Sequence, residues 1–382
     1  MEEIQIRISL LTLFMNHIYS VCLITVVLLA GIVDAQTTPQ TASPTFKLFL
    51  IGDAGEGDTT GATLHDLRRK LLENPNSAVV FLGDNCYVNT FHGLIKVEQG
   101  GYDGSKTAQR RIMSQLNILR EYKGFAYFVP GNHDWFNMAN LRRAKKHLLR
   151  EEKFIEDSMK NFKSLRNEGN VFLPSQGESG PVSRNFNEGR TRVIFIDTYR
   201  LIIAESRPNQ GDNANELKTF YRDLDTQLND ATAKKQKIIV VAHHPIHAKG
   251  KHAQPIVWWQ SAVRRFADSN VNYPPYNKMA IRLDSLLKAH HHPDIYYISG
   301  HEHSLEYFYD DSLHYIVSGA GSRVDQVDYK DKVNDGEYFI WNEEGFFEIE
   351  FYGKYEKILM YHRKDNNSEL QVHCLAGCDA GE

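Results

Sequence analysis

Five short groups of polar residues in this chain carry side chains that can bind metal ions, and each group directly follows an apolar run. In chain order they are Gly52-Asp53-Ala54-Gly55, Gly83-Asp84-Asn85, Gly131-Asn132-His133-Asp134, His243-His244-Pro245 and Gly300-His301-Glu302-His303. Carboxylate, amide and imidazole donors together suit first-row transition metals. One such group alone is more often a turn or a helix cap than a metal site. The ordered set of five is hard to obtain from independent turns, so we predict that the groups form one metal site.

The apolar runs before these groups predict buried strands that alternate with helices. We expect strands over residues 46–51, 78–82, 125–129, 193–196, 238–242 and 295–299, and helices over residues 64–72, 107–121, 139–160, 216–228 and 279–289. A strand-rich end follows, from His314 through Tyr361. Such alternation is typical of an α/β architecture. Because ligands bind at the carboxyl ends of the strands in such sheets, the five polar groups are expected to converge on one edge.

Composition supports a folded protein without a large basic surface. The chain has 382 residues, of which 42% are hydrophobic, and this is enough for a large core. It has 44 basic and 48 acidic residues, which gives a formal charge of −4 at pH 7. Because no basic field would hold a polyanion, we expect no nucleic-acid partner.

The order GDAG, GDN, GNHD, HHP and GHEH resembles the metallophosphoesterase superfamily, and these motifs extend over residues 46 to 305. Tyr87 stands three residues after Asp84, which resembles the position where purple acid phosphatases of the tartrate-resistant type carry a tyrosinate bound to ferric iron. Since the ordinary pKa of tyrosine is about 10, binding as phenolate requires a strongly acidic metal such as Fe³⁺. The alternative is that Tyr87 only packs beside the second motif. The resemblance implies a four-layer α/β/β/α sandwich in a single catalytic domain.

The resemblance also implies a dinuclear metal site and acid phosphatase activity. Asp53, Tyr87 and His303 would bind Fe³⁺, and Asp84 would bridge the two metals. The second site would hold Fe²⁺, Zn²⁺ or Mn²⁺ with three further ligands, Asn132, His243 and His301. Two metals about 3.5–4 Å apart can clamp a phosphate and supply metal-bound hydroxide as the nucleophile. The expected reaction is hydrolysis of phosphate monoesters, either small molecules or phosphoproteins.

Two further histidines match positions that contact the phosphate or protonate the leaving group in the resembling enzymes. His133 follows a ligand directly, and His252 lies nine residues after His243. Either imidazolium could act as a general acid. The alternative for His133 is an exposed side chain, and for His252 a basic rim shared with neighbouring lysines. We expect His244 and the histidine run at 290–292 to be structural.

The chain departs from the small purple acid phosphatase pattern in three places. Cys86 stands where phenylalanine is usual, Trp135 follows the third motif, and residues 255–278 look like an extra segment. Residues 201–215 are expected to form a long loop, which resembles the position of a regulatory loop in that family.

The N-terminus has the pattern of a leader. Residues 1–35 contain two apolar stretches and predict a cleaved signal peptide, with an uncleaved signal anchor as the alternative. Residues 36–45 are then a linker, 46–364 the catalytic domain and 365–382 a C-terminal tail. Such a chain is expected to be secreted or to reside in a lysosomal or endomembrane lumen. Cys374 and Cys378 can pair there and leave Cys86 free, and Asn366 lies in a glycosylation sequon.

Two other functions stay open. One is a phosphodiesterase or nucleotidase on the same scaffold without iron. The other is a membrane-anchored, non-catalytic scaffold protein, which would retain its leader. We expect a monomer that meets a membrane only if the leader is uncleaved.

Overall fold

The strands of the chain form two large sheets. The computed structural model describes residues 43–56, 61–92, 95–136, 140–253, 272–292, 295–310, 313–325 and 338–378. The first sheet has the order β15 (Gln371–Ala376), β14 (Glu356–Arg363), β13 (Glu344–Phe351), β1 (Phe46–Ile51), β2 (Ser77–Phe81) and β5 (Phe125–Phe128). The second has the order β12 (Tyr338–Trp341), β10 (Leu305–Asp310), β11 (Leu313–Ser318), β9 (Ile295–Ser299), β8 (Lys237–Val241), β7 (Thr191–Phe195) and β6 (Val182–Phe186). A separate hairpin contains β3 (Val88–His92) and β4 (Ile95–Gly100).

The strands that lead to the polar groups are parallel within each sheet. In the first sheet β2 pairs with β1 and β5 in parallel, and in the second β8 pairs with β7 and β9 in parallel. These inner strands are buried almost throughout, because each sheet is covered on both faces. Their carboxyl ends therefore deliver the following residues to a common edge.

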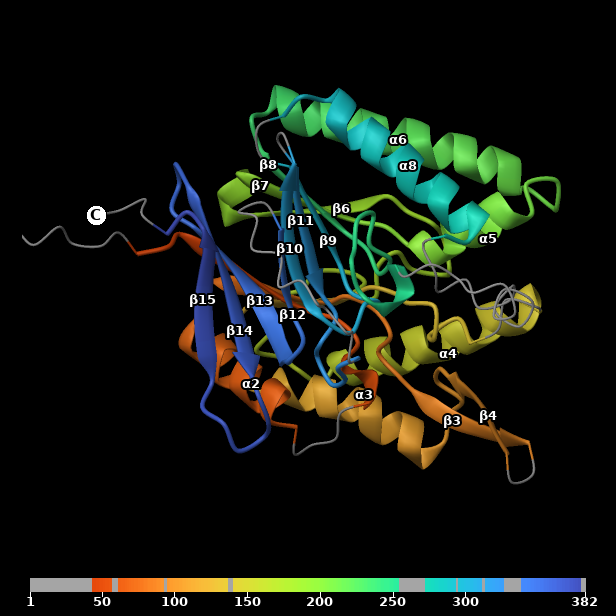
Figure 1. Cartoon of the computed structure of the whole chain (residues 1–382), viewed down its shortest axis with the longest axis horizontal. Helices are drawn as coiled ribbons and strands as arrows, with labels where there is room; N and C mark the ends of the chain where they lie inside the picture. Colours follow the sequence, from red (N-terminus) through yellow and green to blue (C-terminus); the bar gives the residue numbers. More distant parts are fainter. Residues whose placement is uncertain are drawn as a thin grey trace, which may run out of the picture. The chain divides into compact units, whose positions relative to one another are not determined.

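Helices cover the outer face of each sheet, so residues 44–378 form four layers (Figure 1). On the first sheet lie α2 (Ala62–Glu73), α3 (Lys106–Ile118) and α4 (Leu141–Met159). On the second lie α5 (Thr198–Ser206), α6 (Asn213–Ala233) and α8 (Pro274–Ala289). Three apolar cores fill the three interfaces, and the central one joins the two sheets through β1, β2, β8 and β9. The predicted α/β/β/α sandwich is confirmed.

The expected loop over residues 201–215 is wrong at both ends, because α5 extends into it and α6 begins within it. Residues 201–206 belong to α5, and the non-helical connection to α6 is only 207–212. Asp197 caps α5 by accepting a hydrogen bond from the backbone N–H of Arg200. The consecutive apolar residues Leu201, Ile202 and Ile203 are all buried, because α5 packs between its sheet and the neighbouring helices. Of the expected extra segment, residues 274–278 begin α8, and residues 255–271 lie outside the described residues.

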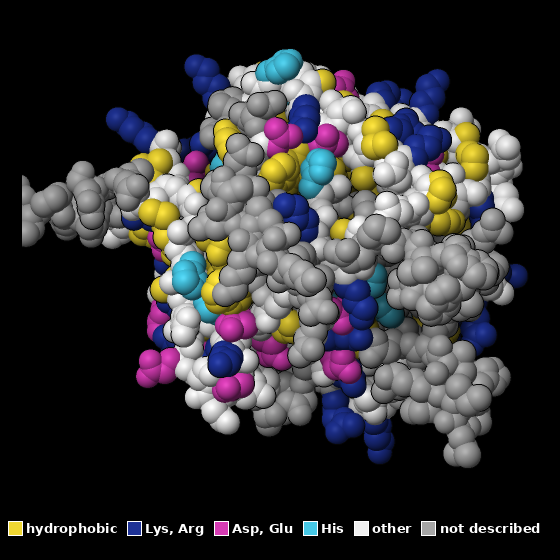
Figure 2. Space-filling view, in the orientation of Figure 1, with side chains coloured by type: hydrophobic (Ala, Val, Ile, Leu, Met, Phe, Trp, Pro, Cys, Tyr) yellow, Lys and Arg dark blue, Asp and Glu magenta, His cyan; other side chains and the backbone are white. Residues whose placement is uncertain are grey.

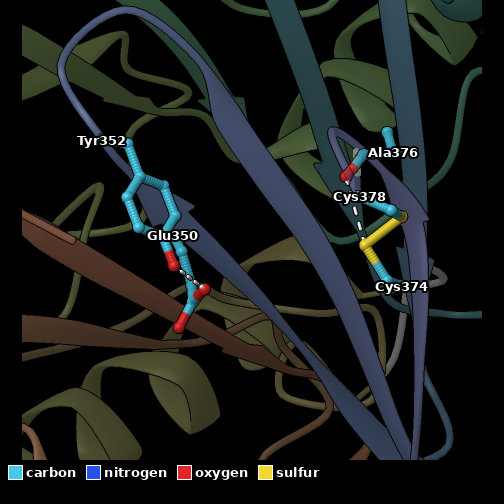
Figure 3. Close-up of a disulfide and its surroundings, with 5 residues drawn as sticks. All are labelled: Glu350, Tyr352, Cys374, Ala376 and Cys378. Atoms are coloured by element: carbon cyan, nitrogen blue, oxygen red, sulfur yellow. Dashed lines mark hydrogen bonds between the residues drawn. A yellow bond between two sulfur atoms is a disulfide. The ribbon is translucent and has the colours of Figure 1, made fainter. Parts of the chain in front are cut away.

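The C-terminal residues join the first sheet. β15 lies within the segment expected to form a tail, and it pairs with β14. Cys374 and Cys378 form a disulfide at the end of this edge strand (Figure 3). Cys86 is free and buried. Within the described ranges, we find no helix long and apolar enough to span a membrane.

Candidate metal centre

The polar groups lie directly after the carboxyl ends of β1, β2, β5, β8 and β9, as their positions in the chain predict. Asp53, Asp84 and His301 each adopt a left-handed backbone conformation, with φ of 55°, 51° and 73°. Such conformations are costly for residues other than glycine and are concentrated at functional sites. Each of the three follows a glycine, and the absence of a side chain on these glycines lets neighbouring groups of the site lie close to the backbone. A Cβ on Gly300 would lie 2.6 Å from Oδ2 of Asp53.

Tyr87 lies within hydrogen-bonding distance of both other side chains that are predicted to bind only the ferric ion. Its Oη donates to Oδ1 of Asp53 at 2.7 Å and lies 3.3 Å from Nε2 of His303. Nε2 of His303 is in turn 3.5 Å from Oδ1 of Asp53. All three side chains are nearly inaccessible to solvent. Side chains from three distant stretches of chain therefore direct oxygen and nitrogen atoms at one point.

A second cluster contains Asn132, His243 and His301. Oδ1 of Asn132 lies 3.0 Å from Nε2 of His243 and 3.1 Å from Nδ1 of His301, and the two ring nitrogens are 3.2 Å apart. The two histidines are buried, whereas Asn132 is partly exposed. This cluster has the donors expected of the divalent site.

Asp84 lies between the two clusters. Its Oδ2 lies 2.9 Å from Oη of Tyr87, and its Oδ1 is 3.4 Å from Nε2 of His243. One carboxylate oxygen therefore faces each cluster, which is the arrangement that a bridging ligand requires.

Hydrogen bonds outside the clusters orient the two imidazoles that face Asp84 and Asp53. Nδ1 of His243 donates to the carbonyl oxygen of Leu82 at 2.8 Å, which leaves Nε2 directed at Asn132 and Asp84. Nδ1 of His303 lies 2.8 Å from Oδ2 of Asp325, which leaves Nε2 directed at Tyr87. Metal-binding histidines usually donate their other ring N–H in this way. The residues present therefore fit a pair of transition metals.

The charges within the site alter several pKa values. Burial, together with the carboxylates of Asp53 and Asp84, raises the pKa of Tyr87 well above its usual value. The phenol is therefore protonated in the metal-free protein, and only a strongly acidic cation could displace the proton. Burial would raise the pKa of Asp84, but His243 and His133 hold it well below its usual range. Burial lowers the pKa of His243, but Asp84 outweighs this and raises it to about 9.

The two predicted acid–base histidines border the clusters. The backbone N–H of His133 donates to Oδ1 of Asp84 at 2.9 Å, and the His133 ring centroid is 4.8 Å from that of Tyr87. Its side chain is 28% exposed, so it can meet a substrate that enters from solvent. The ring of His252 is 4.7 Å from that of His301. The structure thus brings both histidines to the candidate site.

Three residues of the site were not singled out by the sequence. His244 is fully buried, and one of its ring nitrogens lies within 4.8 Å of ligand atoms of His243 and His301. Its position next to His243 was a signal, although it was expected to be structural. Glu302 lies inside a recognised motif, but nothing there indicates its contacts. Asp325 follows His303 by 22 residues, and no local pattern marks it.

The chain belongs to the calcineurin-like phosphoesterase family, whose model matches residues 46–305. This family membership implies a site for two metal ions. No curated protein gave a significant match to the sequence.

Three solved structures resemble this chain at low sequence identity. GAP50, described as the anchor in the inner membrane complex of Plasmodium, has a TM-score of 0.54 and 16% identity, over 86% of this chain and 88% of that one. PhoD has a TM-score of 0.50 and 11% identity, over 88% and 69%. A dimetal phosphatase from Danio rerio has a TM-score of 0.48 and 15% identity, over 87% and 100%. At these identities the likeness concerns the fold alone.

Asp325 is expected to strengthen metal binding through His303. Replacement by Asn should weaken affinity for the metal at that site by about 10–100-fold, because the charged acceptor that orients the imidazole is lost. Metal content after dialysis against graded chelator measures this. An Asp325→Asn variant that retains metal like the unmodified protein would contradict the assigned role.

Proposed function

We propose that this protein is an acid phosphatase of the purple acid phosphatase type, which hydrolyses phosphate monoesters with Fe³⁺ and a divalent metal, Fe²⁺, Zn²⁺ or Mn²⁺. The observation that carries the proposal is the position of Tyr87. Its Oη is within 3.3 Å of Asp53, Asp84 and His303. A tyrosine that only packs beside the motif has no reason to direct its hydroxyl at three potential ligands. Fe³⁺ would be held by Asp53, Tyr87 and His303. The divalent ion would be held by Asn132, His243 and His301. Asp84 would bind both metals.

The metal pair, when bound, would supply Lewis-acid chemistry to a phosphate and to the attacking water. The protein groups supply orientation and protons. Asp53 and Asp84 are held in fixed positions by their backbone conformation and by hydrogen bonds. His133 and His252 stand at the rim, where an imidazolium can donate a proton to the departing oxygen of the ester. Because a donor must be protonated, this step favours acidic pH.

The proposal places the protein in an oxidising compartment, secreted or in the lumen of the endomembrane system. The Cys374–Cys378 disulfide supports this, since such bonds persist where thiols are not kept reduced. Asn366 in the sequon is exposed in the turn between β14 and β15, as an acceptor of a glycan must be. On the face shown in Figure 2, Lys and Arg side chains occur together with Asp and Glu. Such a mixed surface suits small phosphorylated substrates or phosphoproteins better than nucleic acid.

Comparing the rates for a phosphate monoester and a phosphate diester distinguishes this function from the phosphodiesterase alternative. The purified protein is expected to hydrolyse an aryl phosphate monoester at least about 10-fold faster than the matching diester, with highest activity at acidic pH. Kinetic assays across pH, with metal analysis of the same sample, measure this. Preference for the diester in a protein without iron would favour a phosphodiesterase or nucleotidase. No turnover in a fully metallated protein that keeps its leader would favour a scaffold protein.

A further inference from the structure

Residues 249–252 form a short segment that binds, through hydrogen bonds and an ion pair, to carboxylates in and after the GHEH motif. The backbone N–H of Lys249 donates to Oε2 of Glu306 at 2.9 Å, and the backbone N–H of His252 donates to Oε2 of Glu302 at 2.9 Å. Nζ of Lys251 lies 3.0 Å from Oδ1 of Asp325. Three carboxylates within residues 302–325 thus hold three of the four residues of the segment.

Gly250 allows the segment to lie against this motif. A Cβ at this position would be only 2.1 Å from Oε2 of Glu302. No side chain other than hydrogen fits there without displacing the segment or the carboxylate. The backbone of the segment and the carboxyl group are therefore in direct contact.

The segment determines where His252 lies. The His252 ring centroid is 4.7 Å from that of His301, with the planes tilted by 36°, and 6.1 Å from that of His303 in an edge-on arrangement. His252 thus stands over both histidines of the GHEH motif. It is partly exposed, so it borders both the metal ligands and solvent.

Glu302 and Glu306 are unusual because they are buried carboxyl groups beside a metal site without being among its proposed ligands. Each is 1% exposed. Burial of such groups is costly unless they are hydrogen-bonded. Glu302 accepts from His252, and Glu306 accepts from Lys249 and from the hydroxyl of Ser304 at 2.8 Å. Two of these three hydrogen bonds hold the segment that carries His252.

We propose that Glu302 and Glu306 are positioning residues, which hold residues 249–252 so that His252 lies over His301 and His303 as one of the two histidines, with His133, that can protonate the leaving group. This inference rests on the proposed phosphatase function. Neither glutamate touches the substrate in this role. Their effect on the reaction passes through His252.

The test combines Glu306→Ala with His252→Ala, because Glu306 is farther along the chain from the metal ligands than Glu302. His252→Ala is expected to lower kcat for an alkyl phosphate by about 100-fold, as loss of a general acid does. Glu306→Ala should lower kcat by about 10-fold with metal content and KM little changed, since a misplaced acid is less effective. Glu306→Gln, which keeps an acceptor for the Lys249 N–H, should restore most of the activity. Glu178→Ala removes an exposed glutamate and serves as the control.

The double variant decides whether Glu306 acts through His252. In the His252→Ala background, Glu306→Ala should change kcat by less than about 2-fold. A full additional loss in the double variant would overturn the proposal, as would an unchanged kcat in a folded, metallated Glu306→Ala protein.

Hydrogen exchange gives a readout that does not need activity. The amides of residues 249 and 252 should be protected in the unmodified holoprotein and should exchange at least about 10-fold faster in Glu306→Ala and Gly250→Ala. If exchange is faster in both variants but the unmodified protein has no phosphatase activity, the proposed function is wrong. The conclusion that the glutamates hold residues 249–252 in place would still stand. Unchanged exchange in both variants would overturn the positioning role.

Discussion

Replacing Asp84 with Asn is expected to lower kcat/KM for a phosphate monoester by at least about 10³-fold and to reduce the bound metal. Asp84 directs one oxygen at Tyr87 and the other at His243, so its carboxylate faces both clusters. Asn has nearly the same shape but carries no charge and has only one acceptor oxygen. The Asn side chain can therefore offer an oxygen ligand to one cluster but not to both. Kinetics together with metal content measured on the same sample check this.

Asp157→Asn is the matched control for this substitution. Asp157 is an exposed carboxylate on α4 that pairs with Lys153 and Lys160. Exposed pairs of this kind contribute little to stability, so the control should keep its activity and metal. If Asp84→Asn behaved like the control, the bridging role and the dinuclear site would both be excluded.

The His133→Ala variant is expected to lower kcat by about 10²–10⁴-fold for an alkyl phosphate, and far less for an aryl phosphate with a good leaving group. A general acid matters most when the leaving oxygen is strongly basic. His133 is positioned for this, because its backbone is fixed by Asp84 while its ring faces solvent beside Tyr87. Measuring kcat over a series of leaving groups of different pKa tests the prediction.

A loss of kcat in His133→Ala reports on proton donation only if the variant binds as much metal as the unmodified protein. His291→Ala is the control, because His291 is exposed just beyond α8. An equal loss of kcat for all leaving groups would mean that His133 binds the phosphate rather than protonating the leaving oxygen. Full activity of His133→Ala on alkyl phosphates would remove it from the catalytic residues.

Much of the fold could be predicted because the signals for it are local. The run Phe46–Ile51 is apolar except for Lys47, and this is typical of a strand covered on both faces. The helix pattern at 64–72 lies within α2, although α2 begins earlier, at Ala62. Helix α5 was missed because its apolar residues are consecutive rather than spaced at helical intervals. Its burial on several sides depends on contacts with α6, the next helix, and with α8, which is distant in the chain.

In the candidate site, too, features set by the local sequence could be predicted, and contacts between distant parts of the chain could not. Each predicted ligand lies in the loop that follows one of the parallel strands, so parallel pairing brings these loops to one edge. Tyr87 could be singled out only through a resemblance, since no spacing rule requires its ring to turn toward Asp53. Asp325 and Glu306 could not be predicted, because they act through a ring nitrogen and a backbone amide in other parts of the chain. Such contacts exist only once the fold has formed.

The central claim is that Tyr87 binds ferric iron together with Asp53 and His303. A visible absorption spectrum of the purified protein, recorded with its iron content, tests this most directly. We expect a purple protein whose charge-transfer band is lost in Tyr87→Phe, although that variant keeps the buried ring. An iron-free protein, or a band that persists in Tyr87→Phe, would contradict it.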